Sequence, residues 1–411
     1  MRRVVVTGLG TVNPLGHNAK DSWENCVNGV SGVGPITLFN SSDCLVHIAC
    51  ELKGFDPSKY MRPAEVRRRD RFEHMATAAA QEALAHSELE ITEENASRVG
   101  VVVSSAIGGL SSIENAVTTM NSSGPRRVSP FVLPMIMPNG ASGLIGIDTG
   151  AKGPALSVAS ACASGADGLG LAWSLIRGGD IDVAFAGGSD ATICGLGVAA
   201  FDRLSAMSRR NDDYSTTPQP FDKNRDGLVM GEGAAVLMLE DMEHAQARGA
   251  EILGEMVGYA ATADAYHITA PHKQGVGGTA AMRQALDVAG LNIEDVDYIN
   301  AHGTATMLND ASETKAIITT FGERAYDIPI SSTKSMTGHM MGATGALEAL
   351  FCVEAIRTGI VPPTINYETP DPDCDLDYVP NKARDIPIEV AISNAFGFGG
   401  HNSVLAFKKF E

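Results

Sequence analysis

A single cysteine lies among very small residues in the stretch SVASACASGAD, at residues 157–167. The residues before Cys162 predict a strand over 156–160, and those after it predict a helix over about 163–177. A thiol at such a joint faces the free N–H groups of the first helical turn, which favour the thiolate and should lower the pKa. We therefore expect Cys162 to be a nucleophile, with a buried structural cysteine as the alternative.

Two histidines and a lysine lie at comparable joints later in the chain. His302 ends the apolar part of DYINAHGTAT, and Lys334 and His339 precede the helix predicted in STKSMTGHMMGATGALEAL. A single histidine is more often a hydrogen-bonded structural residue than a catalyst. If the two halves of the chain pack with pseudo-twofold symmetry, however, the thiol and both imidazoles meet at one cleft.

The elements that would position these residues occur twice. The stretch AQEALAHSEL at 80–89 matches MRQALDVAGL at 282–291. The stretch GADGLGLAWSLIRGG at 165–179 matches GALEALFCVEAIRTG at 345–359, which is 180 positions later. Because both matches occur in the same order, they indicate an internal duplication.

We predict an α/β fold made of two βαβ-rich halves. The first half, 1–250, holds Cys162 and the dimer interface, and the second, 251–411, holds the histidine pair. Short β-branched runs such as VGVVV predict strands that are buried on both faces, so helices should cover both sides of the sheets.

Composition limits the class of protein. The 411 residues are 44% hydrophobic and carry a net charge of −18, which argues against nucleic acid or an anionic membrane as the main partner. Seven scattered cysteines indicate a reducing compartment, and no apolar run approaches the ~18 residues needed to span a bilayer. The opening MRRVVVTGLG predicts a strand rather than a signal peptide. We expect a soluble, cytoplasmic protein.

Five separated motifs resemble those of one enzyme family. They are SACASG, PFDKNRDGLVMGEGAA, NAHGTAT, STKSMTGHMMGATG and NAFGFGGHN. Together they resemble the β-ketoacyl-acyl-carrier-protein synthases of the thiolase fold, and most closely the elongating, type II-like branch. The match extends from VVVTGLGTVNPLG to the C-terminus, so the resemblance implies a five-layer αβαβα arrangement for essentially the whole chain.

The resemblance implies a Cys-His-His active site. Cys162 would be the nucleophile, and His302 and His339 would assist decarboxylation. Lys334 would be the cation that supports the second histidine, and Glu348 the buried carboxylate of the following helix.

The resemblance gives two roles to Phe398, which lies in the stretch GFGG. Its side chain would be a gate over Cys162, and its backbone N–H would form an oxyanion hole with that of Cys162. A core aromatic is the alternative, but the flanking glycines favour a mobile loop.

The implied reaction has two stages. Cys162 takes an acyl group from its carrier thioester, and a malonyl group on a second carrier then loses carbon dioxide and extends the chain by two carbons. The partners would be an acyl carrier protein and a second copy of the chain. No cofactor is expected, because the phosphopantetheine arm arrives with the carrier. The resemblance also allows a monovalent cation near four residues, Asn300, Glu348, Ser393 and Asn394.

Two alternatives stay open. A ketosynthase of a polyketide pathway would run the same chemistry on another acyl chain. A chain-length partner subunit would be inactive, but such subunits lack the active cysteine that Cys162 supplies here. Thiolases have a second cysteine where a histidine stands in this chain, and starter-type condensing enzymes usually have asparagine in place of one histidine.

The resemblance also indicates substrate and carrier contacts. Ile107 would line the floor of the acyl pocket, and Phe201 would line its wall, with plain core packing as the alternative. An acidic carrier should prefer the basic clusters of this acidic chain. Arg126 and Arg127 match basic positions of the family and are the first candidates for carrier binding, followed by Arg67 and Arg68. The same clusters contain Arg69, Arg71, Arg209 and Arg210.

One metal-like spacing and two departures from the family pattern also occur in the sequence. The stretch CLVHIAC at 44–50 has a metal-like spacing, but a strand would point its ligands apart, so no metal site is expected. Met307 stands where the family usually has Pro, and His401 where Thr is common. Both departures leave the local geometry open but not the class of reaction.

Overall fold

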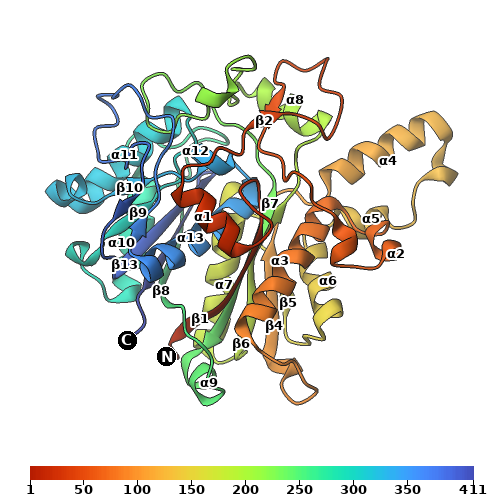
Figure 1. Ribbon diagram of the computed structural model, residues 1–411, viewed down its shortest axis with the longest axis horizontal. Coiled ribbons are helices and arrows are strands. Elements are labelled where there is room, and N and C mark those ends of the chain that lie inside the picture. Colours follow the sequence, from red (N-terminus) through yellow and green to blue (C-terminus); the bar gives the residue numbers. More distant parts are fainter.

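Ten strands form one mixed sheet in the computed structural model, which describes residues 1–411 (Figure 1). The strands are β1 (Val4–Val12), β4 (Val99–Ser104), β5 (Ala155–Leu156), β6 (Val183–Asp190), β7 (Gly233–Asp241), β8 (Gly254–Ala263), β9 (Tyr298–Asn300), β10 (Ile330–Ser331), β13 (Val390–Gly397) and β14 (His401–Lys408). Two small separate pairs are β2 (Gly34–Pro35) with β3 (Ile48–Ala49), and β11 (Ile360–Val361) with β12 (Arg384–Asp385).

The strand order confirms the predicted duplication. It reads β5-β4-β6-β7-β1 in the first half and β10-β9-β13-β14-β8 in the second, so each strand has a counterpart. β4 is parallel to β5 and β6, as β9 is to β10 and β13, and the remaining pairs in each half are antiparallel. The halves of the sheet join where Val5 and Val6 pair with Glu255 and Gly254. The boundary at residue 250 stays a prediction.

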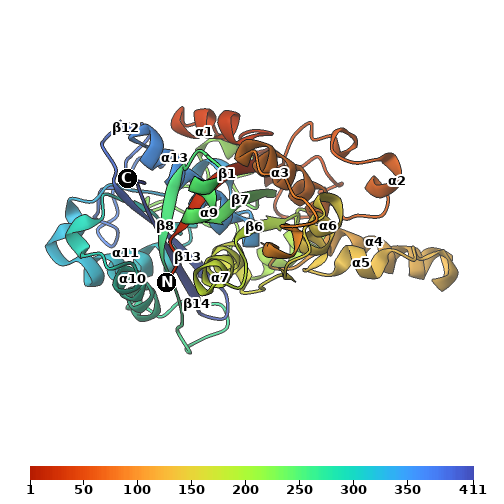
Figure 2. The same cartoon turned by 90° about the horizontal axis from the view of Figure 1, so that it is seen from below.

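Helices on both sides of the strands give the predicted five layers. α7 (Ser164–Gly178) and α13 (Thr344–Thr358) contact each other and strands of both halves, so they form the central layer. α3 (Arg71–Ser87) and α6 (Gly140–Thr149) cover the first half on its outer side. α10 (Val276–Ala289) covers the second, with α11 (Met307–Phe321) packed against it (Figure 2).

Four of the five strands of the first half are buried, as their apolar runs predict. β1, β4, β6 and β7 are buried along their whole lengths, whereas the edge strand β5 is exposed. The alanine-rich face of α3 lies so close to β1 that a Cβ on Gly10 would be 2.1 Å from the carbonyl oxygen of Ala79. The small residues of the helix thereby let it pack closely on the sheet and exclude water between them.

The two central helices meet at their N-terminal ends. A Cβ on Gly165 would lie 2.5 Å from the carbonyl oxygen of Gly342, and one on Gly345 would lie 2.9 Å from the nitrogen of Ala166. A short 3-10 turn precedes each helix, η4 (Ala161–Ala163) before α7 and η8 (Met341–Ala343) before α13. The close approach brings the segment around Cys162 next to the segment that follows His339.

The remaining helices connect these layers. They are α1 (Ala19–Val27), α2 (Pro63–Val66), α4 (Leu110–Ser123), α5 (Val132–Ile136), α8 (Gly195–Arg203), α9 (Met242–Ala247), α12 (Lys334–Thr337) and the 3-10 turns η1 (Pro57–Lys59), η2 (Ala96–Arg98), η3 (Pro125–Arg127), η5 (Tyr214–Thr216), η6 (Ile293–Asp295) and η7 (Gly322–Tyr326). α4 projects from the body, and Ser112 is its one buried residue (Figure 1). None of the helices combines the length and apolar character needed to cross a bilayer.

Candidate active site

Cys162 lies in the turn η4, directly before α7. The predicted strand over 156–160 ends at Leu156, and the helix begins at Ser164, so the cysteine sits outside the first turn of the α-helix. Ala161 has a left-handed φ of 51°, which its small side chain tolerates, and this reverses the chain just before the sulfur. The thiol is buried, with 8% of the residue exposed.

The expectation of a lowered cysteine pKa is wrong for the protein without substrate. Burial raises the pKa of Cys162 to about 11, although Lys334 and the backbone N–H groups of Phe398 and Cys162 act to lower it. Removing the thiolate from water outweighs these stabilising groups. The thiol is therefore neutral at pH 7. The two N–H groups that face the sulfur are the pair expected to form the oxyanion hole.

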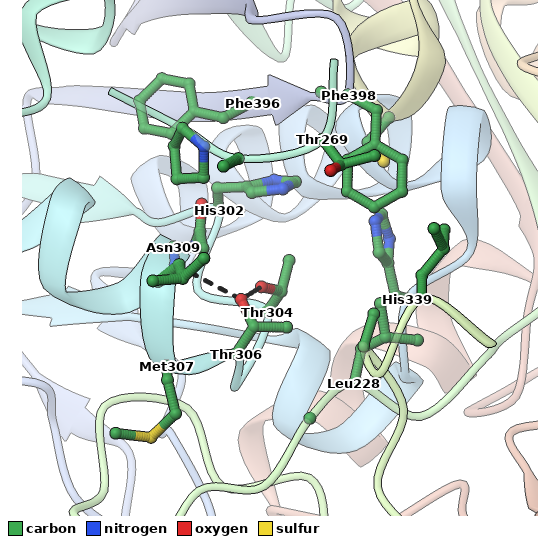
Figure 3. Close-up of a pocket in the computed structure, with 18 of the residues that line it drawn as sticks. Leu228, Thr269, His302, Thr304, Thr306, Met307, Asn309, His339, Phe396 and Phe398 are labelled. Atoms are coloured by element: carbon green, nitrogen blue, oxygen red, sulfur yellow. Dashed lines mark hydrogen bonds between the residues drawn. The ribbon is translucent and has the colours of Figure 1, made fainter. Parts of the chain in front are cut away.

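The two predicted histidines lie together. His302 follows β9, and His339 follows α12, so each ring projects from the end of a short element. Their ring centroids are 5.5 Å apart at an interplanar angle of 86°, and both residues are 3% exposed. Figure 3 shows both rings directed into the same pocket, with the His339 ring below Phe398 and the His302 ring beside it.

Both imidazoles are neutral at pH 7. Burial lowers the pKa of His302 well below its ordinary range, and the charge of Lys334 and the neighbouring His339 lower it further. The pKa of His339 is lowered to about 3, mainly by burial and to a smaller extent by the charge of Lys334. A neutral imidazole carries one N–H donor and one acceptor nitrogen. The pair can therefore donate two hydrogen bonds to one oxygen without bringing positive charge.

Lys334 forms a buried ion pair with Glu348. Its Nζ lies 2.6 Å from the carboxylate Oε1, and both residues are 1% exposed. Burial raises the pKa of Glu348 to about 7, and the lysine opposes this rise. The lysine thereby remains beside the histidines, where its charge disfavours their protonation.

Phe398 lies in the tight turn between β13 and β14. The next two residues, Gly399 and Gly400, have left-handed φ values of 87° and 76°, which only glycine adopts at low cost. The Phe398 ring stacks on that of Phe201 from α8, with centroids 6.3 Å apart and planes at 22°. A change in this turn moves both the ring and the N–H that faces the sulfur.

These groups line one cavity of about 260 Å³. Its walls include Cys162, both histidines, Phe398 and the predicted pocket residue Phe201. Further lining residues are Leu204, Leu228, Thr269, Thr304, Thr306, Met307, Asn309 and Phe396 (Figure 3). The structure therefore brings together the thiol and the imidazoles that the sequence placed in different halves.

Ile107 does not line this cavity, and its role as the floor of the acyl pocket stays a prediction. Met307 is the first residue of α11 and lines the cavity, while Thr306 caps the helix by accepting the N–H of Asn309. Residue 307 is a position that suits proline, because it is the first residue of the helix. Methionine at this position changes the wall of the cavity but leaves the cap by Thr306 in place. His401 is exposed at the start of β14 and does not line the cavity.

The sequence did not reveal Glu313, a buried carboxylate on α11. Its two oxygens accept the backbone N–H groups of His302 and Gly303 at 2.8 and 2.7 Å, so it fixes the backbone that carries the first histidine. The side-chain nitrogen of Asn394 also donates to it at 3.1 Å. A glutamate in the helix directly after NAHGTAT was the available signal, but its burial follows from the packing of α11.

The arginines of the predicted basic clusters differ in exposure and in pairing. Arg126, Arg127, Arg67 and Arg68 are exposed, although Arg68 pairs with Glu65 at 3.3 Å and stacks over the ring of Phe131 at 4.9 Å. The other four arginines also form ion pairs, and Arg69 is the one among them that is buried, so it cannot belong to a free basic surface. These pairs are Arg69 with Asp148, Arg71 with Glu232, Arg209 with Asp202 and Arg210 with Asp226.

Comparison with known proteins gives consistent matches along the chain. Residues 1–245 match the model of the β-ketoacyl synthase N-terminal domain, and residues 253–368 match that of the β-ketoacyl synthase C-terminal domain. The chain belongs to the β-ketoacyl synthase family. Members of this family are acyltransferases that condense acyl groups, so this β-ketoacyl synthase is an enzyme of that class.

Individual relatives agree with the family models over the full length. This β-ketoacyl synthase is 49% identical to a 3-oxoacyl-(acyl-carrier-protein) synthase 2 of Staphylococcus aureus, over 100% of this chain and 99% of the relative. It is 50% identical to the protein of the same name from Synechocystis, with the same coverage. Among solved structures, a chain from the complex of a type II polyketide-synthase acyl-carrier protein with its ketosynthase matches this chain. The match has a TM-score of 0.93 and 34% identity, and it covers 100% of both chains. The thiolase fold predicted from the sequence is thereby confirmed.

Proposed function

We propose that the chain elongates fatty acyl groups by decarboxylative Claisen condensation on Cys162. The observation that carries the proposal is the cavity in which one cysteine meets two neutral histidines and a pair of backbone N–H donors. Each of these groups matches one requirement of the reaction. The high identity to proteins named 3-oxoacyl-(acyl-carrier-protein) synthase 2 favours fatty acids as the substrate class.

Acyl transfer to the enzyme comes first. The sulfur of Cys162 attacks the thioester carbonyl, a new C–S bond forms, and the bond to the carrier sulfur breaks. The thiol proton leaves with the carrier thiol. The N–H groups of Cys162 and Phe398 stabilise the oxyanion that forms on the way.

Decarboxylation and condensation follow. The malonyl group loses carbon dioxide, and the two electrons of the broken C–C bond form an enolate. The N–H groups of His302 and His339 donate hydrogen bonds to the enolate oxygen and stabilise its negative charge. Neutral imidazoles are sufficient for this role, so no charged imidazolium is needed. The enolate carbon then attacks the acyl-cysteine carbonyl, a C–C bond forms, and the Cys162 sulfur leaves and is reprotonated.

The supporting residues hold this geometry. Glu313 fixes the backbone at His302, and the hydroxyl of Thr344 lies 3.2 Å from Nδ1 of His339. Burial and then the charge of Lys334 keep both imidazoles neutral, and Glu348 pairs with the lysine. The Phe398 ring lines the same cavity as Cys162 and acts as a gate over the thiol.

An acyl carrier protein and a second copy of this chain are the proposed partners. Exposed Arg126, Arg127, Arg67 and Arg68 offer charge to an acidic carrier, and a related ketosynthase was solved with its carrier. Large apolar side chains are exposed on α4, α5 and α6 and on the edge strand β5, which lie on one side of the molecule (Figure 1). These are Val117, Met120, Leu133, Ile147 and Leu156.

A second copy would cover this face, because an exposed apolar edge otherwise favours aggregation. Ile147 is 77% exposed, so Ile147→Glu should turn a dimer into a monomer in sedimentation, while Val288→Glu on α10 should not. A wild-type chain that sediments as a monomer would contradict the dimer. The cytoplasm is the proposed location, since all seven cysteines are free thiols.

Buried polar atoms support a bound monovalent cation. The side-chain oxygens of Asn300, Ser393 and Asn394 and one oxygen of Glu348 have no hydrogen-bond partner in the protein. A hard cation prefers such oxygen ligands, so these residues fit the expected site. A cation held there would supply positive charge beside the Lys334–Glu348 pair. Its test is a rise in melting temperature on adding potassium, which Asn300→Ala should abolish.

Acylation of Cys162 tests the proposed function most simply. Intact-mass measurement after incubation with acyl carriers of graded length should show one added acyl group, and none in Cys162→Ala. A chain that never gains this mass would be the inactive partner subunit. A preference for polyketide intermediates over plain acyl chains would instead favour the polyketide ketosynthase, the second candidate, which the structural match to such an enzyme supports.

A further inference from the structure

A buried carboxylate that the mechanism does not use lies beside the second central helix. Asp190 is the last residue of β6 and has no exposed surface. Its Oδ2 accepts the N–H groups of Gly342 at 2.6 Å and Ala106 at 3.0 Å. Its Oδ1 accepts the hydroxyl of Ser105 at 2.6 Å. Neutral donors thus surround a group that would otherwise be costly to bury.

Gly342 is the counterpart of Cys162 in the duplicated fold. It is the middle residue of η8, as Cys162 is of η4, and the two turns precede α13 and α7 at a spacing of 180 residues. The first residue of each turn has a left-handed φ, 51° at Ala161 and 47° at Met341. A left-handed residue next to a right-handed one directs successive N–H groups to one side and makes a concavity that binds anions.

The two turns use this concavity differently. At η4 the N–H of Cys162 is available to a reacting oxygen, together with that of Phe398. At η8 the N–H of Gly342 is already taken by Asp190. A Cβ at residue 342 would lie 2.6 Å from the carboxylate oxygen, so only glycine leaves room for it. The carboxylate thus fills the second anion site permanently.

We propose that Asp190 is a positioning residue for the reaction proposed above, because it fixes the turn η8, which follows His339. The His339 backbone itself is held by hydrogen bonds with Val229 and Gly231. Asp190 acts on the imidazole through Gly342 and Thr344, since the Thr344 hydroxyl lies 3.2 Å from Nδ1 of that histidine. A carboxylate that holds Gly342 therefore helps to set where the imidazole stands in the cavity.

The same carboxylate also holds the segment around Ile107. Ala106 donates directly to Asp190, and Gly108 donates to the Ser105 hydroxyl at 2.8 Å, so the tethers lie on both sides of Ile107. Asp190 thereby connects the segment of the predicted acyl-pocket residue Ile107 to the turn η8 that follows His339. The inference rests on the proposed function but concerns a residue that lies outside the cavity.

The test compares Asp190→Asn with a matched control, Glu240→Gln. Glu240 is equally buried, lies on the neighbouring strand β7 and has its own donors, but it pairs with Val183 at the opposite end of β6. Ser105→Ala, which removes a single donor to Asp190, serves as the milder variant if Asp190→Asn does not fold. Each full-length variant receives malonyl-loaded carrier for carbon dioxide release and octanoyl-loaded carrier for acylation of Cys162.

An amide at residue 190 has one acceptor oxygen instead of two, so it cannot accept from Gly342, Ala106 and Ser105 as the carboxylate does, and its hold on η8 weakens. We expect carbon dioxide release to fall by roughly tenfold or more, as misplaced catalytic groups do, while acylation stays within about twofold of the wild type. The pH midpoint of Cys162 alkylation should also move down, because the charge of Asp190 adds to burial in raising the pKa of this thiol. The split between carbon dioxide release and acylation is the readout that a merely structural residue would not produce.

The outcomes separate the inference from the proposed function. Equal losses of both activities in Asp190→Asn, or no loss of either, would overturn the role of Asp190. If only Ser105→Ala folds, the same split between the two activities must appear in it, and its absence overturns the inference. A wild-type enzyme that releases no carbon dioxide would instead reject the proposed function itself.

Discussion

Burial and one lysine set the protonation states of the reacting groups. Burial lowers the pKa of His339 to about 3 and raises that of Cys162 to about 11, and Lys334 lowers both. The imidazoles are therefore ready donors at neutral pH, whereas the thiol must lose its proton during acyl transfer. This division matches a reaction in which the cysteine and the histidines act in separate stages.

The histidines should be needed for decarboxylation but not for acyl transfer. His302→Ala or His339→Ala removes one enolate donor, and a donor of this kind contributes ~3–4 kcal/mol, or roughly 10²–10³ in rate. Intact mass should still show the acyl group on Cys162, while carbon dioxide release falls. His17→Ala, whose ring bonds the Lys53 carbonyl instead, should change neither. Loss of acylation in both active-site variants would reject this division.

The reactivity of the free thiol should depend on pH in a defined direction. The pKa of Cys162 is raised to about 11, above the ~8.5 of an unperturbed cysteine, so its thiolate population grows tenfold per pH unit up to that range. Iodoacetamide labelling of Cys162 should therefore accelerate steadily from pH 7 to 10. A plateau reached below pH 8 would show that the thiol is already ionised near neutrality and would contradict this environment.

Local motifs predicted the reacting residues but not their environment. Cys162, His302, His339 and Phe398 each stand at a small-residue joint or glycine turn that is visible in the sequence. The expected direction of the Cys162 pKa was wrong because burial outweighs the N–H groups at the helix terminus, and the depth of burial is not visible in a short stretch of sequence. Glu313 and Asp190 were missed because their partners come from distant elements, which no short stretch records.

At the scale of elements, the close contact between α7 and α13 holds the site together. A Cβ on Gly165 would meet the carbonyl oxygen of Gly342 at 2.5 Å, whereas one on Gly178, in the last turn of the same helix, would meet Asp180 at 3.5 Å. Gly165→Ala should therefore lower the free energy of unfolding by ~1–3 kcal/mol.

Gly178→Ala is the matched control, and it should be neutral or stabilising by up to ~1 kcal/mol, because alanine favours helix. Urea denaturation followed by circular dichroism measures both changes. If the two variants have the same stability, the helices are not in the tight contact described here.

Element boundaries near the site were the least predictable part of the fold. The small residues around Cys162 suit a strand, a turn or a helix start, and tertiary contacts select the 3-10 turn η4. Likewise, the runs of arginine looked uniform in sequence, but folding pairs Arg69 and Arg71 with carboxylates and leaves Arg67 and Arg68 exposed. The predictions of the strand-helix order and of the duplication were correct, because they depend on patterns that extend over many residues.

At the scale of the whole molecule, duplication produces two similar turns with different uses. The first turn carries the thiol and keeps its N–H available, and the second is filled by Asp190 and supports His339. The nucleophile and the histidines come from different halves, so neither half contains a complete site. The central helices bring them together, which explains why one cavity serves both stages.

Formation of the extended acyl chain needs the cysteine and the histidines in one cavity, so product analysis is the decisive measurement. Wild-type enzyme receives octanoyl-loaded and malonyl-loaded carrier together, and the masses of the carriers are then determined by mass spectrometry. We expect a 3-oxoacyl carrier two carbons longer than the octanoyl donor, with one carbon dioxide released per product, and no such product from Cys162→Ala. Equal product from Cys162→Ala, or carbon dioxide release without any extended chain in the wild type, would contradict it.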